Sequence, residues 1–193
     1  MLILASASPR RRELLRRICP EFSVEASDVD EALAAGPVPP AVAALALRKA
    51  RAVARRTATG AVLAADTVVV VDGEVLGKPA GPAEARAMLR RLRGRAHDVF
   101  TGVAVVDAAT GREASGTARS RVLMASYPDA TIDAYVASGA PLDKAGAYAI
   151  QDLGGHLVDG LVGSYTNVMG LPLGVTRRLL AGFGVPVSGE PAP

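Results

Sequence analysis

A long apolar run in the first half of the chain constrains the fold more than any other feature of the sequence. The run Ala61–Val71 reads AVLAADTVVVV and ends at the pair Asp72-Gly73. Valine-rich runs are typical of buried strands, and an Asp-Gly pair is a strong signal for a two-residue hairpin turn. We therefore expect a buried strand over 61–71 and a return strand over Glu74–Leu76.

Shorter signals on both sides of this hairpin predict further elements. Ser8 followed by Pro9 suits the start of a helix over 9–18. Other helices are expected over 40–56, 82–93, 129–137 and 173–181. Further strands are expected over 1–5, 22–26, 99–106 and 117–125, with short strands and glycine turns over 147–161. This order of elements predicts an α/β fold, a mixed sheet with surrounding helices.

The composition suits one globular domain. The chain has 193 residues, of which 50% are apolar and 21% are charged, and it contains few aromatic residues, so an aliphatic core is expected. We expect residues 1–184 to form a single domain with two lobes. The Pro-rich tail over 185–193 is expected to be frayed.

Several classes of protein are disfavoured. No apolar run approaches about 18 residues, so no membrane span is expected. The N-terminus lacks a basic region and a long apolar stretch, so no signal peptide is expected. We therefore expect a cytoplasmic location. The single cysteine excludes an intrachain disulfide, and the two histidines show no zinc-type spacing. With a net charge of +3 and no interleaved aromatics, the chain does not resemble a single-strand nucleic-acid platform.

The segment LASASPRRRELL places three consecutive arginines at the expected start of the first helix. Backbone N–H groups and the helix dipole favour anions there, and guanidinium groups match phosphate oxygens. Cations at that position are unfavourable by roughly 0.3–1 kcal/mol each, so an anion is expected beside Arg10 and Arg11. A bound phosphate, a nearby carboxylate and simple solvation all remain open, whereas the absence of a glycine-rich P-loop excludes a Walker-type site.

Two charged residues interrupt apolar patterns. Lys49 shares one helix face with Val42, Leu45 and Val53, so its ammonium has to snorkel, form an ion pair or bind a ligand. Asp66 interrupts the valine-rich strand, where a carboxylate is costly unless it is paired, bound to a metal or exposed in a cleft. A general base, a metal ligand and a structural partner of a lysine are all compatible with Asp66.

Three further segments are candidates for a site. The predicted hairpin brings Lys78 roughly opposite Thr67, close to Asp66. Asp28, Asp30 and Glu31 form an acidic set that suits a divalent ion or a solvated loop equally well. The glycine-rich segments PLDKAGAYAIQ and GSYTNVMGLPL suit close approach to a ligand, and also ordinary turns.

Together these segments resemble a known family. LASASPRRRELL, DVDE, ALRKARAVA, AADTVVVVDGEVLGKP, AHDVFTGVAV, PLDKAGAYAIQ and GSYTNVMGLPL are similar, in order and over nearly the whole chain, to Maf proteins. These are nucleoside triphosphate pyrophosphatases once described as septum-formation inhibitors. The resemblance implies a deep central cleft in a fold similar to that of inosine triphosphate pyrophosphatases. It also implies release of a monophosphate and pyrophosphate, a divalent cation (Mg²⁺ or Mn²⁺), and compatibility with a homodimer.

The resemblance also assigns roles to residues. Asp66 matches the proton acceptor, and Glu31 together with Asp66 matches acidic positions suited to the metal. The three positions that mark a dTTP/UTP-type subgroup are Arg10, Thr67 and Gln151. Other substrate-binding positions are Ser6, Arg11, Lys49 and Lys78. Ala149 stands where glycine is expected in AGAYGIQ, which bears on base preference.

Two alternatives to an enzymatic function stay open. One is a nucleotide-binding regulator of cell division that acts without turnover, and the other is a basic nucleic-acid-binding protein.

Overall fold

The computed structural model describes residues 1–188, without the side chains of residues 152, 153 and 155. The strands are β1 (Leu2–Leu4), β2 (Ser23–Val24), β3 (Ala61–Val71), β4 (Glu74–Leu76), β5 (Ala96–Asp107), β6 (Glu113–Met124) and β7 (Val158–Val162). The α-helices are α1 (Pro9–Arg16), α2 (Val38–Ala54), α3 (Pro82–Leu92), α4 (Asp129–Ala137), α5 (Tyr165–Val168) and α6 (Leu173–Gly182). Two short 3₁₀ helices, η1 (Ala145–Ala147) and η2 (Asp152–Leu157), precede β7.

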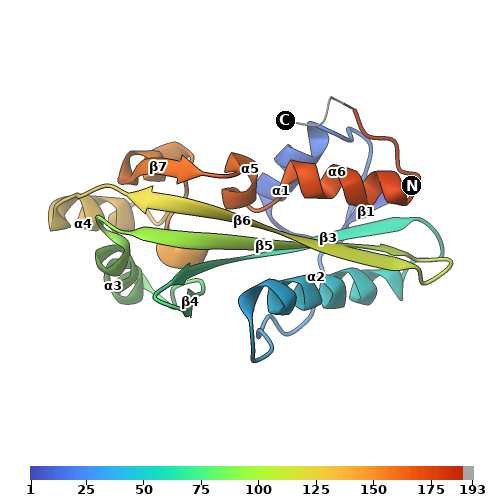
Figure 1. The fold of residues 1–193 in the computed structure, drawn as a ribbon, viewed down its shortest axis with the longest axis horizontal. Coiled ribbons are helices and arrows are strands. Elements are labelled where there is room, and N and C mark those ends of the chain that lie inside the picture. Colours follow the sequence, from blue (N-terminus) through green and yellow to red (C-terminus); the bar gives the residue numbers. More distant parts are fainter. Residues whose placement is uncertain (189–193) are drawn as a thin grey trace. The chain divides into compact units, whose positions relative to one another are not determined.

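The strands form one mixed sheet, as the sequence predicts. Their order is β2-β1-β3-β5-β6-β7, and β4 pairs with β3 alongside this path (Figure 1). β1 pairs in parallel with both β2 and β3, whereas β3 and β4 are antiparallel. No helix of the described chain is long and apolar enough to cross a membrane.

The β3–β4 hairpin confirms the expectation drawn from Asp72-Gly73. Val69 pairs with Leu76 and Val71 pairs with Glu74, which leaves the two turn residues between the strands. Asp72 has φ 53° and Gly73 has φ 79°, the left-handed values that a type I′ turn requires at both positions. The turn chemistry therefore determines this register locally.

The chain divides into two compact units. The first contains Met1–Asp66, Thr101–Ala118 and the described chain from Gly170 onward. The second contains Thr67–Phe100 and Arg119–Met169. The long strands β3, β5 and β6 each continue from one unit into the other.

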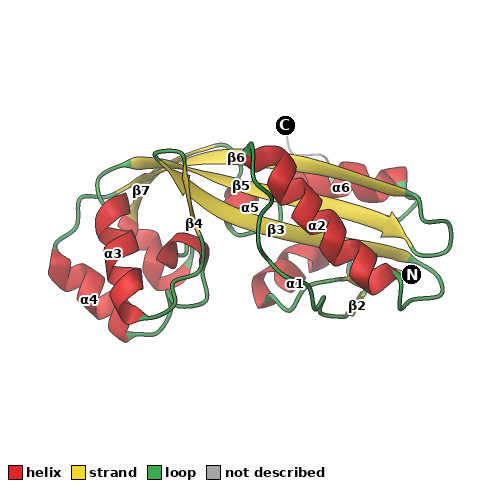
Figure 2. Ribbon diagram, turned by 90° about the horizontal axis from the view of Figure 1, so that it is seen from below, coloured by secondary structure: helices red, strands yellow, loops and turns green. Residues whose placement is uncertain are grey.

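In the first unit, α2 packs closely on the strands. Ala46, Ala50 and Val53 of α2 join a core with Ile3, Val62 and Ala104 from three strands. α2 covers one face of these strand segments, and α1 and α6 lie on the other (Figures 1 and 2). A β-carbon on Gly102 of β5 would lie 2.5 Å from the carbonyl oxygen of Val42, so glycine allows α2 to approach the strand this closely.

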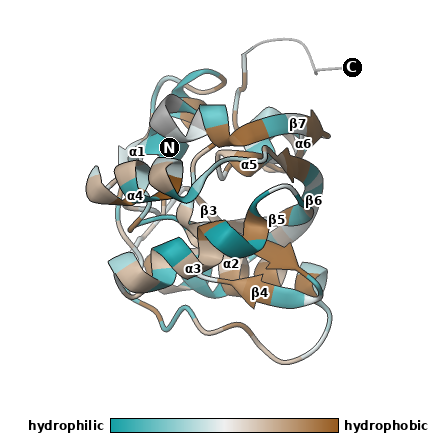
Figure 3. Ribbon diagram, turned by 90° about the vertical axis from the view of Figure 1, so that its left-hand side faces the viewer, coloured by the Kyte–Doolittle hydropathy of each residue, from teal (hydrophilic) through white to brown (hydrophobic). Residues whose placement is uncertain are grey.

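In the second unit, α3 and α4 pack against each other and against the strands. Their core residues are Ala85, Met88, Leu89, Leu92, Ile132, Tyr135 and Val136. Arg86 pairs with Asp133, and Arg90 pairs with Asp129, on the exposed side of the two helices. α3 accordingly alternates between hydrophilic and hydrophobic residues along its length (Figure 3).

A buried histidine lies in this second unit. His97 is 3% exposed, and its Nε2 lies 2.7 Å from the hydroxyl of Tyr148. Nδ1 of His97 is buried and has no hydrogen-bond partner among the described residues. Burial lowers the pKa of His97 to about 4, against a weaker opposing effect of the Asp98 charge. The imidazole is therefore neutral in the folded protein at neutral pH.

We expect this histidine to make the protein sensitive to mild acid. Because the pKa of His97 is lower in the folded state than its ordinary value of 6.5, the unfolded state takes up the proton first as the pH falls. The stability is present above pH 6.5 and is lost towards pH 4, by about 3 kcal/mol from this group. The loss is measured as the difference in the free energy of unfolding between pH 7 and pH 4, by denaturant unfolding of the wild type and of His97→Gln. An equal loss of stability in both proteins would contradict the prediction.

Some boundaries differ from the expectations. The prediction that α2 begins at Pro40 is wrong, because Val38, Pro39 and Pro40 form its first turn, where N–H groups need no partner within the helix. Ser8 does precede α1, but its side chain makes no cap hydrogen bond. The helix α5 was not expected from the sequence, although Ser164 caps it by accepting from the Asn167 N–H at 3.2 Å. The predicted tail over 185–193 lies partly outside the described residues.

Candidate active site

A buried lysine links two carboxylates in the first unit. The Nζ atom of Lys49 donates to Oδ1 of Asp66 at 2.7 Å and to Oε1 of Glu31 at 2.6 Å. Lys49 is 5% exposed and Asp66 is 8% exposed. The two residues that interrupt apolar patterns in the sequence are therefore partners of each other.

The fold explains how this cluster arises. Asp66 follows Ala64 and Ala65 in β3, both fully buried, while Lys49 lies among the buried residues of α2. Because α2 packs on the strands through small side chains, the long lysine side chain can reach the β3 carboxylate. Glu31 comes from the loop before α2, and its side chain stays 56% exposed.

The cluster carries more negative than positive charge. Its two carboxylates share one ammonium, which leaves one formal negative charge among these three groups. Lys49 and Asp66 are buried, whereas the Glu31 side chain is 56% exposed. A buried carboxylate held by a hydrogen-bonded lysine is oriented, and it can accept a proton or bind a cation. Removing the lysine would leave the two carboxylates without the ammonium that offsets their negative charges.

The first helix contributes Arg11 next to this cluster. Nε of Arg11 donates to the carbonyl oxygen of Gly170 at 2.8 Å, and Nη1 lies 3.4 Å from Oγ of Ser6. Burial lowers the pKa of Arg11, while the charges of Asp66 and Glu31 act to raise it. The guanidinium therefore lies within electrostatic range of both carboxylates and stays protonated.

Arg10, the neighbouring arginine, is half-buried. It makes no hydrogen bond or ion pair with another residue of the described chain. Its charge disfavours the charged form of Arg11, so two adjacent cations lie at the start of α1. The charges of Asp66 and Glu31 partly offset this positive charge at Arg11, and a phosphate group would offset it further.

The remaining expected residues belong to the second unit. Thr67 is half-buried and Lys78 is exposed. The β3–β4 pairing ends at Val69 and Leu76, so Thr67 and Lys78 each lie two residues beyond the last pair. Oε1 of Gln151 is buried and has no hydrogen-bond partner within residues 1–188. A buried amide oxygen without a partner is costly, which marks Gln151 as a candidate for a ligand contact.

The acidic set DVDE does not act as one group. Oδ1 of Asp30 accepts from the N–H of Ala32 at 3.0 Å, so this carboxylate stabilises the turn of its own loop. Glu31 is the member that reaches Lys49. Within residues 1–188, no group of three or more His, Cys, Asp or Glu side chains is arranged to hold a metal ion. Glu31 and Asp66 together still supply the one or two carboxylates with which Mg²⁺ is usually bound when phosphates complete its coordination.

Sequence reasoning missed two contacts around this cluster. The Gly170 carbonyl that accepts from Arg11 belongs to GSYTNVMGLPL, and Gly170 has φ 109°, a value that favours glycine. Arg48 of α2 binds the loop that contains Glu31. Both contacts involve backbone carbonyls, which every residue carries, so no residue pattern signals them.

Comparison with known proteins identifies the family. The profile of the family described as Maf-like protein matches residues 1–183. The chain belongs to the Maf-like family. The resemblance drawn from the sequence motifs is thus confirmed.

Curated relatives of this Maf-like chain cover nearly all of it. It is 54% identical over 191 residues to a dTTP/UTP pyrophosphatase of Moorella thermoacetica, which covers 98% of each chain. It is 51% identical over 188 residues to a dTTP/UTP pyrophosphatase of Myxococcus xanthus, covering 97% of this chain and 94% of the relative. Among solved structures, the Ham1 protein of Staphylococcus aureus matches with a TM-score of 0.47 and 17% identity, over 64% of this chain and 71% of that chain.

The departure from the Maf pattern at Ala149 is accommodated in the second unit. Ala149 is 5% exposed, and its N–H donates to the hydroxyl of Tyr135 at 3.2 Å. A β-carbon on Gly154 would lie 2.3 Å from the carbonyl oxygen of Ala149, so the glycine that follows Gln151 in this segment lets the chain pack here. The extra methyl group of Ala149 is thus part of a tightly packed turn.

Proposed function

We propose that this chain hydrolyses nucleoside triphosphates to the monophosphate and pyrophosphate, with dTTP and UTP as preferred substrates. The observation that carries the proposal is the buried Lys49, which holds the carboxylates of Asp66 and Glu31 beside the arginines of α1. The relatives named dTTP/UTP pyrophosphatase support the same reaction and the same bases.

Asp66 acts as the proton acceptor in this proposal. It takes a proton from a water molecule whose oxygen attacks the α-phosphorus, and the bond between that phosphorus and the bridging oxygen to the β-phosphorus breaks. Pyrophosphate leaves, and the proton passes from Asp66 to solvent. Lys49 orients the Asp66 carboxylate through the 2.7 Å hydrogen bond.

Basic residues neutralise the triphosphate in this proposal. Arg10 and Arg11 bind phosphate oxygens, and Ser6 supports Arg11 through its hydroxyl. Following the family resemblance, Lys78 is a further cation for the substrate, and Thr67 and Gln151 are the residues assigned to the base. The buried and unpartnered Oε1 of Gln151 suits a base that offers an N–H donor.

A divalent cation, Mg²⁺ or Mn²⁺, completes the proposed site. Glu31 and Asp66 would hold it, because their carboxylate oxygens are the donors such ions prefer. The ion, when bound, supplies positive charge that stabilises the phosphate oxygens during the reaction. A homodimer stays a prediction of the family resemblance, and a cytoplasmic location stays a prediction from the N-terminal sequence.

The reaction is tested by product analysis over a panel of triphosphates. Purified protein is incubated with Mg²⁺ or Mn²⁺ and dTTP, UTP, CTP, ATP or GTP, and the products are separated. We expect monophosphate with pyrophosphate, formed fastest from dTTP and UTP. Diphosphate with phosphate would show a different hydrolase, and another preferred base would refute the subgroup. Binding of nucleotide without any product would favour a regulator that acts without turnover.

A further inference from the structure

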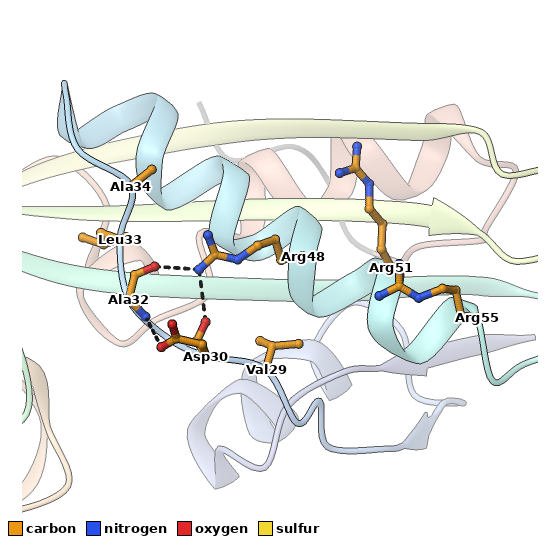
Figure 4. Close-up of a pocket in the computed structure, with 8 residues that line it drawn as sticks. All are labelled: Val29, Asp30, Ala32, Leu33, Ala34, Arg48, Arg51 and Arg55. Carbon is orange, nitrogen blue, oxygen red and sulfur yellow. Dashed lines mark hydrogen bonds between the residues drawn. The ribbon is translucent and has the colours of Figure 1, made fainter.

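Arg48 has no role in the chemistry described so far. It precedes Lys49 on α2 and is half-buried. Its Nη2 donates to the carbonyl oxygen of Ala32 at 2.6 Å and to that of Asp30 at 3.1 Å (Figure 4). These two carbonyls flank Glu31 on either side. Consecutive residues of α2 therefore hold the same loop, Lys49 by the Glu31 side chain and Arg48 by the adjacent backbone.

The loop that contains Glu31 has no regular structure to fix it. Residues 25–37 form neither helix nor strand, and the Glu31 side chain is 56% exposed. Ordering such a segment costs conformational entropy, which burial offsets little here. The turn made by Asp30 and the N–H of Ala32 stabilises the loop locally, Lys49 holds the Glu31 side chain, and Arg56 binds the loop farther back, at Glu25 and Ala26. Arg48 adds the contacts to the backbone on both sides of Glu31.

We propose that Arg48 is a positioning residue for the reaction, which keeps the Glu31 carboxylate at Lys49 by binding the carbonyl groups on both sides of it. The inference rests on the proposed function, in which Glu31 and Asp66 share Lys49. Arginine suits the binding of two carbonyl oxygens because its guanidinium presents several N–H donors in a fixed plane. Lysine instead presents one compact ammonium group.

Two other arginines, one on α2 and one at the residue that follows it, serve as references. Arg51 and Arg55 line the same groove as Arg48, together with residues of the loop (Figure 4). Arg51 donates to the carboxylate of Glu113, outside this loop. The Arg55 side chain is exposed and has no hydrogen bond or ion pair among residues 1–188. Arg55→Gln is therefore a matched control, which removes an equal charge at the end of α2 without breaking a hydrogen bond to the loop.

The kinetic test is a double-mutant cycle with Glu31. We expect Arg48→Gln to lower kcat/KM by about tenfold, because the two hydrogen bonds that hold the loop are lost. Arg48→Lys should retain more activity than Arg48→Gln, and Arg55→Gln should match the wild type. In the Glu31→Gln background, Arg48→Gln should lower kcat/KM by less than about twofold, because the residue to be positioned is already lost. Equal losses in both backgrounds would overturn the proposal.

Hydrogen exchange of the free protein tests the structural half of the proposal without turnover. Millisecond-to-second exchange of peptides that cover residues 28–36 should be faster in Arg48→Gln than in the wild type and unchanged in Arg55→Gln. Unchanged exchange in Arg48→Gln would overturn the role of Arg48, whatever the kinetics. Absence of turnover in the wild type would instead refute the proposed function, and the exchange data would still decide whether Arg48 holds the loop.

Discussion

Asp66→Asn is expected to lower kcat by about a thousandfold, within the range for a lost general base, while the protein stays folded. Asparagine has nearly the size of aspartate, and its amide oxygen can still accept the hydrogen bond that Lys49 donates at 2.7 Å. What the amide cannot do is accept the proton of the attacking water. Lys49 keeps a charged partner in Glu31, so no buried ammonium is left without a carboxylate. The variant therefore separates catalysis from folding.

Pyrophosphate release from dTTP measures this effect. Asp159→Asn is a suitable control, because Asp159 is exposed on β7 in the second unit and the same chemical change there should leave kcat unchanged. Circular dichroism and thermal unfolding of both variants confirm that the fold is intact. Turnover by Asp66→Asn within about tenfold of the wild type would remove Asp66 from the role of general base.

Gly102→Ala is expected to cause the largest loss of stability, about 3–5 kcal/mol, in the upper range for single substitutions. The added β-carbon would lie 2.5 Å from the carbonyl oxygen of Val42 and 2.7 Å from the nitrogen of Ala43. Both contacts are with backbone atoms of α2, which cannot rotate away as a side chain can. The whole helix has to move off β5, and this loosens the core formed by Ala46, Ala50 and their neighbours.

Denaturant unfolding monitored by circular dichroism checks this prediction. Gly174→Ala makes the same substitution in α6, where a β-carbon would meet nothing within 4 Å. That variant should be as stable as the wild type or more stable by up to about 1 kcal/mol, because alanine favours a helix over glycine. If Gly102→Ala unfolds within about 1 kcal/mol of the wild type, α2 can shift at little cost and the close packing is not essential.

The two glycines of these predictions show which packing contacts cannot be predicted from the sequence. The sequence predicts a strand around Gly102 and a helix around Gly174, but it does not show which of the two glycines meets another segment closely. The difference between them is the backbone of α2, which comes from residues about 60 positions earlier in the chain in the case of Gly102. Close packing of segments distant in sequence is a property of the folded protein, so no local pattern signals it.

Local features, by contrast, were predictable. The β3–β4 hairpin follows from Asp72-Gly73, whose preference for left-handed φ needs no distant contact. The mixed sheet follows from the alternation of valine-rich runs and amphipathic helices. The start of α2 was misplaced because prolines are normally taken to precede a helix, whereas the first helical turn also accepts them.

The candidate site was predictable in part, less than the local hairpin and more than the close packing at Gly102. The sequence by itself determined that Lys49 and Asp66 had to be compensated, because a charge in an apolar stripe is costly wherever the stripe is buried. It also determined the positive charge at the start of α1. Only the tertiary structure decided that Lys49 compensates Asp66, 17 positions away, and that Glu31 is the acidic residue that joins them. The physical reason is that burial is encoded by local periodicity, whereas the partner of a buried charge is set by how α2, β3 and the preceding loop pack in space.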